Sequence, residues 1–477
     1  MTRPEQGRWA ARAAAAWHSP TLTTWASMAV RFSALLLVLP LALTRFSAAE
    51  VAVWQLFATV LMLMALLDFG LAPTFARMLA LARGDRGGHR PTVGDAARLL
   101  ASLRWLYVRV AIAIVLLFAA VGSVALSGPI GQLAQPSQGW WSWALVLATS
   151  GATLLGQGYA SALIGMDRTA LLRRWEALCG LGQIATSVAV LAAGGGLVAL
   201  VGSYQAWAVF NAWRNRRLLA ALHPELFACP PARDRAVLAA VWPVAWRSGL
   251  GVLASHGLIH VSGLVYAQLR PAAEVAAYLL ALRFAMAVSQ LAQAPFYTKL
   301  PQLATLHAGG REAEKIALAQ RGMRQALWVY AAGAAAVALA VEPALAVLGS
   351  ETPFVDGRFW AALALAFFVE RYGAMHLQLY SLTNRIVWHI ASGVTGVLLC
   401  LLVVPLHAVA GPLALPLAML LAHAVFYAPY SVRLSLRQIG RGWLAFERSA
   451  AIPPALAMAA ATAFALIAPP WAGAGLR

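Results

Sequence analysis

The feature that most constrains the fold is a succession of apolar segments, each about as long as a membrane-crossing helix. Such a helix needs roughly 20 mostly apolar residues. Only 11% of the 477 residues are charged, well below the roughly 25% of soluble domains, so the sequence predicts an all-α integral membrane protein. We predict about 13 transmembrane helices, at 24–43, 51–74, 106–127, 141–165, 176–193, 197–213, 241–265, 275–297, 326–347, 359–383, 387–404, 408–431 and 451–468.

The net charge of +19 is unevenly distributed over the loops between these segments. Loops at 128–140, 194–196 and 405–407 contain no Lys or Arg. The alternating loops are basic, and they lie at 75–105, 166–175, 214–240, 298–325 and 432–448. Because cytoplasmic loops of membrane proteins collect Lys and Arg, we expect the N-terminus and the basic loops in the cytoplasm. This distribution accounts for most of the charge, so we expect no nucleic-acid partner.

The stretch from Ala48 to Arg77 is echoed later in the chain. Ala-Ala-Glu-Val-Ala at Ala48 returns at Ala272, an offset of 224 residues, and Ala-Pro at 72–73 returns at 294–295 with an offset of 222. A third echo relates 164–168 to 381–385. Such duplication is common in transporters. It predicts two six-helix bundles in a parallel repeat around a central cavity, plus one extra C-terminal helix.

The predicted domain boundaries follow from this repeat. Residues 1–218 form the first bundle, with a start at 6–17 that can lie on the inner membrane surface, and 219–240 form a cytoplasmic linker. Residues 241–448 form the second bundle, and 449–477 carry the additional helix.

Soluble-type catalytic signals are missing from the sequence. There is neither a phosphate-binding Gly-rich loop ending in Lys-Ser/Thr nor a His-Glu-x-x-His zinc motif. The three cysteines, at 179, 229 and 400, are scattered, so we expect no disulfide and no metal site. The sequence therefore predicts a protein that is not an enzyme and needs no cofactor.

Arginines inside the predicted spans are candidate binding residues. An Arg at the centre of a membrane helix is costly and usually faces a cavity or a partner. Four qualify: Arg31, Arg247, Arg283 and Arg371. Alternatives stay open, because Arg31, Arg247 and Arg283 can extend to a membrane surface, and Arg371 can pair with the adjacent Glu370.

Polar side chains accompany two of these arginines at helical spacing. Gln290, Gln293 and Tyr297 follow Arg283 on one face of its helix, and Gln378 follows Arg371 two turns later. Because glutamines and arginines are disfavoured against lipid, we expect both stripes to line the cavity.

Candidate ion-coupling residues are few. Asp68 and Glu370 are the membrane carboxylates that we identify, and Asp68 is also a candidate for a structural pairing with an arginine. His256 and His260 lie one turn apart and can titrate near neutral pH, or can simply form hydrogen bonds within the bundle.

Several motifs resemble a known family. The duplicated six-helix halves, Trp54, the run Leu-Asp-Phe-Gly-Leu at 67–71 and the small-residue stretch ending at Arg77 resemble the polysaccharide-transporter (Wzx-type) flippases. These belong to the multidrug/oligosaccharidyl-lipid/polysaccharide (MOP) superfamily, with its MATE-like fold. The segment from Tyr278 to Lys299 is similar to the matching family region, and the resemblance covers most of residues 20–430.

The resemblance implies a flippase of the bacterial inner membrane. Its cargo would be a polyprenyl-diphosphate-linked oligosaccharide, an O-antigen or exopolysaccharide repeat unit, moved by alternating access. The four span arginines would bind the diphosphate, since guanidinium groups recognise phosphate oxygens bidentately, while Gln290, Gln293, Tyr297 and Gln378 would bind the glycan. Membrane lipid, a proton or sodium ion, and glycan polymerases are the implied partners.

Two other functions compete with this interpretation. A cation-coupled multidrug exporter of the same superfamily would favour membrane carboxylates over arginines. A membrane glycosyltransferase or ligase would carry acidic active-site residues or a large external loop, and the sequence shows neither.

Overall fold

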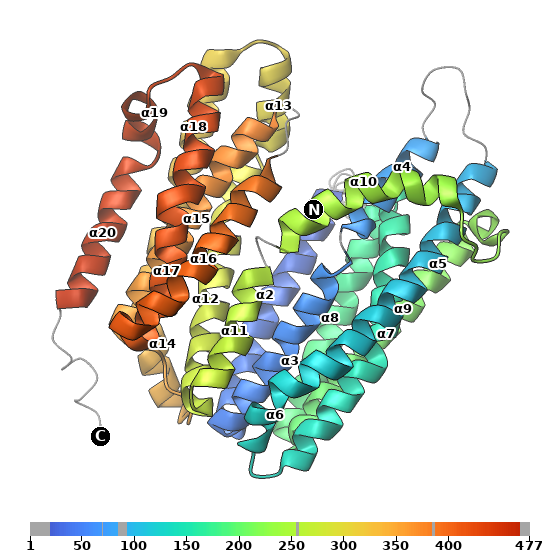
Figure 1. Ribbon diagram of the computed structural model, residues 1–477, viewed down its shortest axis with the longest axis horizontal. Helices are drawn as coiled ribbons and strands as arrows, with labels where there is room; N and C mark the ends of the chain where they lie inside the picture. Colours follow the sequence, from blue (N-terminus) through green and yellow to red (C-terminus); the bar gives the residue numbers. More distant parts are fainter. Residues whose placement is uncertain (1–19, 69, 84–92, 254–256, 384–386, 468–477) are drawn as a thin grey trace, which may run out of the picture. The chain divides into compact units, whose positions relative to one another are not determined.

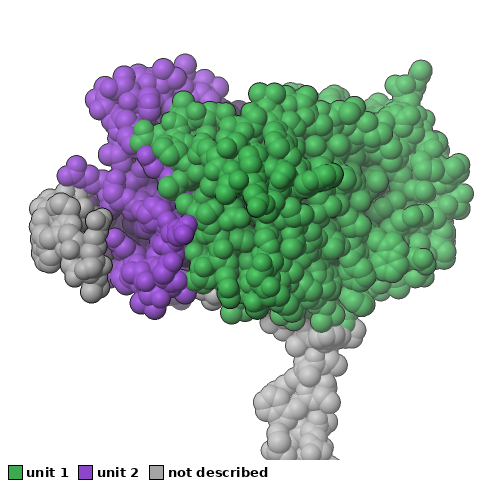
Figure 2. All heavy atoms as spheres, turned by 90° about the horizontal axis from the view of Figure 1, so that it is seen from below, with its two compact units in different colours: residues 1–273 green, residues 274–477 purple. Residues whose placement is uncertain are grey.

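The computed structural model describes residues 20–68, 70–83, 93–253, 257–383 and 387–467. These residues form helices and short connections, without a β-strand among them. The chain divides into two compact units, Met1–Ala273 (unit 1) and Glu274–Arg477 (unit 2), which are coloured separately in Figure 2.

Unit 1 is built around two pairs of packed helices. Helix α7 packs along α9, and α2 packs along α8. Its α-helices are α2 (Pro20–Arg45), α3 (Ala48–Leu66), α4 (Leu71–Arg83), α5 (Val93–Leu117), α6 (Ser123–Gly131), α7 (Pro136–Gly165), α8 (Thr169–Ala192), α9 (Leu197–Leu222), α10 (Arg235–Val252) and α11 (Leu258–Leu269). A π-helical turn, Phe118–Gly122, joins α5 to α6, so this segment continues beyond the predicted span at 106–127.

The sequence analysis treats 51–74 as one span, but the structure breaks it. Helix α3 ends at Leu66 and α4 begins at Leu71. The Asp68 carboxylate accepts hydrogen bonds from the backbone amides of Gly70 (2.8 Å) and Ala72 (3.3 Å). Gly70 has a φ of +70°, a conformation that side chains disfavour. Asp68 therefore caps the start of α4 and separates it from α3.

Unit 2 is organised around α15, which packs against α14, α17, α18 and α20. Its α-helices are α12 (Ala272–Tyr297), α13 (Leu300–Ala308), α14 (Glu312–Leu348), α15 (Gly357–Ser381), α16 (Trp388–Ala410), α17 (Ala414–Ala422), α18 (Ala428–Ile439), α19 (Trp443–Ala450) and α20 (Ile452–Ile467). Figure 1 shows α19 as a short helix between α18 and α20 at the end of this unit.

Long apolar helices and apolar outer faces define a multi-pass membrane protein. Val347 and Val409, for example, are each 88% exposed, which suits contact with lipid rather than water. Among the described residues, six segments are long and apolar enough to cross a membrane: Ala48–Leu66, Ala96–Gly131, Thr169–Ala192, Ala272–His307, Glu312–Leu348 and Trp388–Ile439. A shorter apolar segment covers Ile452–Ala463 in α20.

All 13 predicted ranges fall largely on helices. The number of membrane crossings and the repeat layout stay predictions, as do the domain boundaries 1–218, 219–240, 241–448 and 449–477. The compact units divide at Ala273, so α10 and α11, which the sequence analysis assigns to the second bundle, group with unit 1. The predicted surface segment at 6–17 lies outside the described residues.

Candidate functional site

A polar cluster, the α12–α15 cluster, lies inside unit 2. Its members come from two facing helices and are Ser289, Gln293 and Tyr297 on α12, and Glu370, Arg371 and Gln378 on α15. The Arg371 guanidinium donates hydrogen bonds to the Ser289 hydroxyl from Nε (3.1 Å) and from Nη2 (2.9 Å). It also donates from Nη1 to Gln293 Oε1 (3.3 Å).

A carboxylate completes the Arg371 environment. Nη2 of Arg371 lies 3.2 Å from Glu370 Oε2, and the Arg371 side chain is 11% exposed. An arginine has five N–H donors, and Arg371 makes four bonds with side chains of its own unit. The pairing with Glu370, one of the two roles left open by the sequence, is therefore formed in this structure. An anion would reach Arg371 by replacing some of these bonds.

A second contact joins the same two helices further along. Gln378 Nε2 lies 3.5 Å from the Tyr297 hydroxyl, at the outer limit of a hydrogen bond. The spacing of seven residues from Arg371 to Gln378 places both on one face of α15. The structure thus brings together five predicted site residues: Gln293, Tyr297, Glu370, Arg371 and Gln378.

The other predicted residues of α12 are Arg283 and Gln290. Arg283 is half-buried and precedes Ser289 by six residues, or about 9 Å along a helix axis. Gln290 is exposed. Their expected roles in binding stay predictions.

The predicted residues of unit 1 have varied surroundings. Asp68 is bonded to backbone amides and to the hydroxyl of Tyr107 (3.2 Å), rather than to the arginine that the sequence analysis considers. His260 is buried on α11. Arg31 lies on α2 and Arg247 on α10, but both side chains fall outside the described part of the structure, as does the whole of His256.

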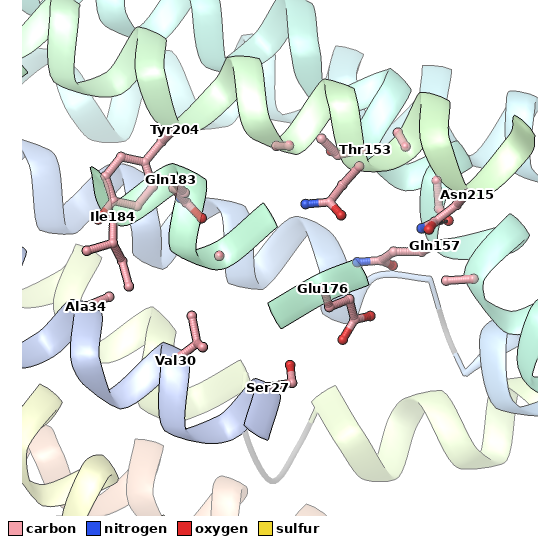
Figure 3. Close-up of a pocket in the computed structure, with 16 residues that line it drawn as sticks. Ser27, Val30, Ala34, Thr153, Gln157, Glu176, Gln183, Ile184, Tyr204 and Asn215 are labelled. Atoms are coloured by element: carbon pink, nitrogen blue, oxygen red, sulfur yellow. Dashed lines mark hydrogen bonds between the residues drawn. The ribbon is translucent and has the colours of Figure 1, made fainter. Parts of the chain in front are cut away.

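Unit 1 contains a polar pocket that the sequence analysis does not identify. The pocket lies among α2, α7, α8 and α9 and has a volume of about 510 Å³. This volume is within the range typical of small-molecule sites. Figure 3 shows its amide, hydroxyl and carboxylate side chains. The polar lining consists of Ser27, Thr153, Gln157, Glu176, Gln183, Tyr204, Asn211 and Asn215.

Glycines allow the helices around this pocket to approach closely. A Cβ atom on Gly156 of α7 would lie 2.6 Å from the Cβ of Ala212 on α9. One on Gly180 of α8 would lie 2.8 Å from Val30 of α2. Both distances are too short for real side chains, so glycine at these positions sets the width of the pocket.

Charges near the pocket come from α8 and α9. Glu176 accepts a hydrogen bond from Arg173 (2.7 Å), and its side chain is 21% exposed. Arg214 is buried behind the pocket, where its guanidinium donates to Asn215 Oδ1 (2.5 Å) and approaches Cys179 Sγ (3.5 Å). The pocket therefore has one carboxylate in its wall and one buried cation close by.

Two polar atoms, one in the pocket lining and one next to it, are buried without a hydrogen-bond partner among the described residues. These are Oδ1 of Asn211, in the pocket lining, and Nε of Arg214. A buried polar atom without a partner is costly. Bound water or a ligand hydroxyl would relieve that cost at Asn211.

The sequence analysis places Arg214 in the basic loop 214–240, which is wrong: α9 continues to Leu222 and buries this side chain. The apolar residues Leu218 and Leu219, four and five positions further on, are the signal for this longer helix. Glu176 is not among the carboxylates predicted to lie in the membrane, because it is the first residue of the predicted span 176–193. Among the described residues, no group of three or more His, Cys, Asp or Glu is placed to hold a metal.

Solved transporter structures share this fold. A multidrug resistance MATE family transporter of the MOP superfamily, in an inward-facing conformation, aligns over 87% of this chain and 95% of its own, with a TM-score of 0.67 and 15% identity. The lipid II flippase MurJ, in an inward closed conformation, aligns over 93% and 91%, with a TM-score of 0.65 and 11% identity. A MOP superfamily transporter from Pyrococcus furiosus Vc1 aligns over 89% and 95%, with a TM-score of 0.53 and 12% identity.

No protein-family model matches the chain. No curated relative matches it either. The chain therefore shares its fold with a multidrug resistance MATE family transporter of the MOP superfamily and with the lipid II flippase MurJ. Identities of 11–15% establish the fold alone, and the Wzx-type resemblance of the sequence stays a prediction.

Proposed function

We propose that the protein is a flippase that moves a polyprenyl-diphosphate-linked oligosaccharide across the bacterial inner membrane by alternating access. The observation that carries this proposal is the polar pocket of unit 1. Its lining is rich in amides and hydroxyls, which pair with sugar hydroxyls, and it includes the buried, unpartnered Oδ1 of Asn211.

The diphosphate of the cargo needs cationic donors. Arg371 supplies one in unit 2, where Gln293 and Ser289 hold its guanidinium in place. A diphosphate offers several acceptor oxygens, so it can accept several hydrogen bonds from Arg371 in place of these side chains. Arg31, Arg247 and Arg283 remain proposed headgroup ligands, and Gln290, Tyr297 and Gln378 remain proposed glycan ligands. Their role is binding rather than bond chemistry.

One observation favours the second candidate, a cation-coupled multidrug exporter. Glu176 places a carboxylate in the wall of the unit 1 pocket, where it can attract a cation. The MATE neighbours share this fold, and their names describe multidrug resistance transporters. A proton or sodium ion bound at Glu176 also suits a coupled flippase, so the cargo has to decide between the two candidates.

The deciding experiment is reconstitution in phospholipid vesicles. A fluorescent polyprenyl-diphosphate-linked glycan is incorporated in both leaflets, and a membrane-impermeant reductant bleaches the outer one. Flipping appears as bleaching beyond half of the fluorescence, measured with and without proton and sodium gradients. A fluorescent cationic drug is tested in parallel vesicles.

We expect the wild-type protein to flip the glycan lipid. Arg371→Ala, which removes the charge-assisted hydrogen bonds of Arg371, should lower the rate by about tenfold or more. Asn211→Leu should impair flipping by removing a sugar acceptor. Arg358→Ala on α15 and Arg216→Ala on α9 are matched controls, because both arginines are exposed. Bleaching equal to that of protein-free vesicles, together with drug transport, would establish the exporter instead.

A further inference from the structure

Unit 2 contains a fully buried pair of titratable side chains outside the α12–α15 cluster. His376 on α15 and Glu447 on α19 are both 0% exposed, and Nε2 of His376 lies 3.0 Å from Oε1 of Glu447. The two groups are at ion-pair distance without the alignment of a hydrogen bond. Neither imidazole nitrogen and neither carboxylate oxygen has an aligned partner among the described residues. Buried polar atoms in this condition need an explanation.

Packing alone does not explain Glu447. The buried face of α19 consists of Phe446, Glu447 and Ala450, and the other residues of this short helix are exposed. Phe446 packs on His376 with ring centroids 5.7 Å apart, and its carbonyl accepts a hydrogen bond from Gln320 of α14 (2.9 Å). A leucine at position 447 would fill the same space at lower cost, because buried ion pairs are often replaced by apolar residues without loss of stability.

The electrostatic surroundings of the pair are sparse. From α15, Tyr372 packs edge-on against His376, with centroids 4.9 Å apart, and its hydroxyl also faces the Glu447 carboxylate. From α18, Arg433 lines the same groove as Glu447 and Tyr372. Helix α14 contributes the uncharged Gln320, the next residue on α19 is the exposed Arg448, and α20 carries no titratable residue in its sequence.

An apolar groove adjoins the pair. It has a volume of about 790 Å³, lies among α15, α18, α19 and α20, and includes Tyr372 and Glu447 in its walls. The groove therefore extends to the side chain of Glu447, whose carboxylate oxygens are covered in this structure. Metal and halide ions would lose their hydration on such a route, which leaves the proton as the ion that suits the pair.

The possible charge states of the pair favour a proton as the ion that binds there. A carboxylate beside a neutral imidazole gives the pair a net charge of −1. A carboxylic acid beside an imidazolium, which holds two more protons, gives it a net charge of +1. A net charge is costly at a site without water, so the state with a single proton, shared between imidazole and carboxylate, suits the buried geometry. Once exposed to water, free Glu and His titrate near about 4.3 and 6.5, and both lose the proton above pH 7.

The connection to α18 provides a way to expose the pair. Gly440 adopts a left-handed φ of +63°, and Gly440, Arg441 and Gly442 are all exposed between the two helices. Two glycines within three residues allow the chain to change direction there. Helix α19 can then separate from α14 and α15 without a rearrangement of α18.

From this geometry we propose that His376 and Glu447 form a proton-binding site that holds α19 against the bundle of unit 2. The docked state binds one proton more than the undocked state above pH 7. Docking is therefore strongest between the pKa values of free Glu and free His, about 4.3 and 6.5, and weakens as the pH rises above this window, by up to about tenfold per pH unit. This inference does not rest on the proposed cargo, because docking can be measured without transport.

Hydrogen–deuterium exchange of the full-length protein in lipid nanodiscs tests the site. Protection of Trp443–Ala450 is measured between pH 6 and 9 and corrected for the base catalysis of exchange. We expect wild-type protection to fall as the pH rises above 7. Glu447→Gln keeps a neutral amide beside a neutral imidazole, so above pH 7 its protection should be independent of pH. Glu351→Gln, at an exposed position of the same unit, should keep the wild-type slope.

A flat wild-type profile, or a wild-type slope in Glu447→Gln, would overturn the proposal. If Glu447→Gln does not yield a monodisperse protein, the double variant His376→Phe/Glu447→Leu replaces the pair with apolar side chains of similar size. Its protection should be high and independent of pH. A wild-type slope in the double variant would equally exclude the pair as the proton site.

Discussion

Arg371 on α15 donates two hydrogen bonds to the single hydroxyl of Ser289 on α12, at 3.1 Å from Nε and 2.9 Å from Nη2. Serines in membrane helices commonly bond to the carbonyl oxygen one turn earlier, as Ser431 does with Tyr427. Ser289 instead fixes the orientation of a cation on the neighbouring helix. This contact locks the register of α12 against α15.

Removal of that hydroxyl should weaken the whole cluster. Hydrogen bonds to charged groups contribute about 1.5–3 kcal/mol, so Ser289→Ala should lower the free energy of unfolding by that amount and reduce glycan flipping. The measurement is a double-mutant cycle with Arg371→Ala. Thermal unfolding in detergent is compared for the wild type, the two single variants and the double variant. Thr298→Ala, at an exposed site whose hydroxyl bonds to its own helix, should change little. Additive effects of the two substitutions would show that Ser289 and Arg371 are not coupled.

Asp68 should matter for stability through its capping bonds. Asp68→Ala removes the cap of α4 and should cost about 1–2 kcal/mol. Tyr107→Phe removes only one bond to the carboxylate and should cost about 0.5–1.5 kcal/mol. Thermal unfolding measures both. Tyr159→Phe is the control, since the Tyr159 ring stacks on Phe227. If Asp68→Ala stops transport but leaves the unfolding temperature unchanged, Asp68 acts in coupling rather than as a cap.

The width of the unit 1 pocket should depend on Gly156. A methyl group there would lie 2.6 Å from the Ala212 side chain, so Gly156→Ala should force α7 away from α9 at a cost of about 1–3 kcal/mol. It should also weaken glycan binding. Gly151→Ala is the matched control on the same helix, because nothing lies within 4 Å of its new methyl group. Equal unfolding temperatures for the two variants would contradict the close approach of α7 and α9.

The start of α10 should be sensitive to acid. Backbone amides of Val237 and Ala236, together with the Arg98 guanidinium, hold the pKa of Asp234 below its ordinary value, with the Val237 bond the largest cause. A lowered pKa means that the cap is fully present above about pH 4 and is lost as the pH falls through the pKa of the folded state. Hydrogen exchange at the first turn of α10 should therefore rise below pH 4. Asp234→Asn should remove this pH dependence, and a profile unchanged by the substitution would exclude Asp234 as its source.

The helices were largely predictable because apolar length and helical periodicity are local properties. The same periodicity placed Gln293, Tyr297, Arg371 and Gln378 on faces that the structure brings together. The break at Asp68 was not predicted, because the residues on both sides of it are strongly apolar and read as one continuous span. The cap depends on hydrogen bonds from nearby backbone amides to the Asp68 carboxylate.

The missed residues are those whose partners are far away in the sequence. His376 and Glu447 are 71 residues apart and meet only because α19 folds back onto α15. In the sequence, Arg214 is followed by basic residues that are typical of a cytoplasmic loop. Its side chain is buried because α9 packs against α8, where it approaches Cys179. Sequence patterns indicate which face of a helix a residue occupies, but not which distant helix covers that face.

The bonds around Arg371 have a consequence for selectivity. Four of its five N–H donors are bonded to Ser289, Gln293 and Glu370, so a ligand with a single acceptor atom can use the remaining donor or take over one bond. A ligand with several acceptors on adjacent centres can take over several bonds at once. If Arg371 binds the cargo as proposed, its resident partners favour ligands with several acceptor atoms over monovalent anions such as chloride.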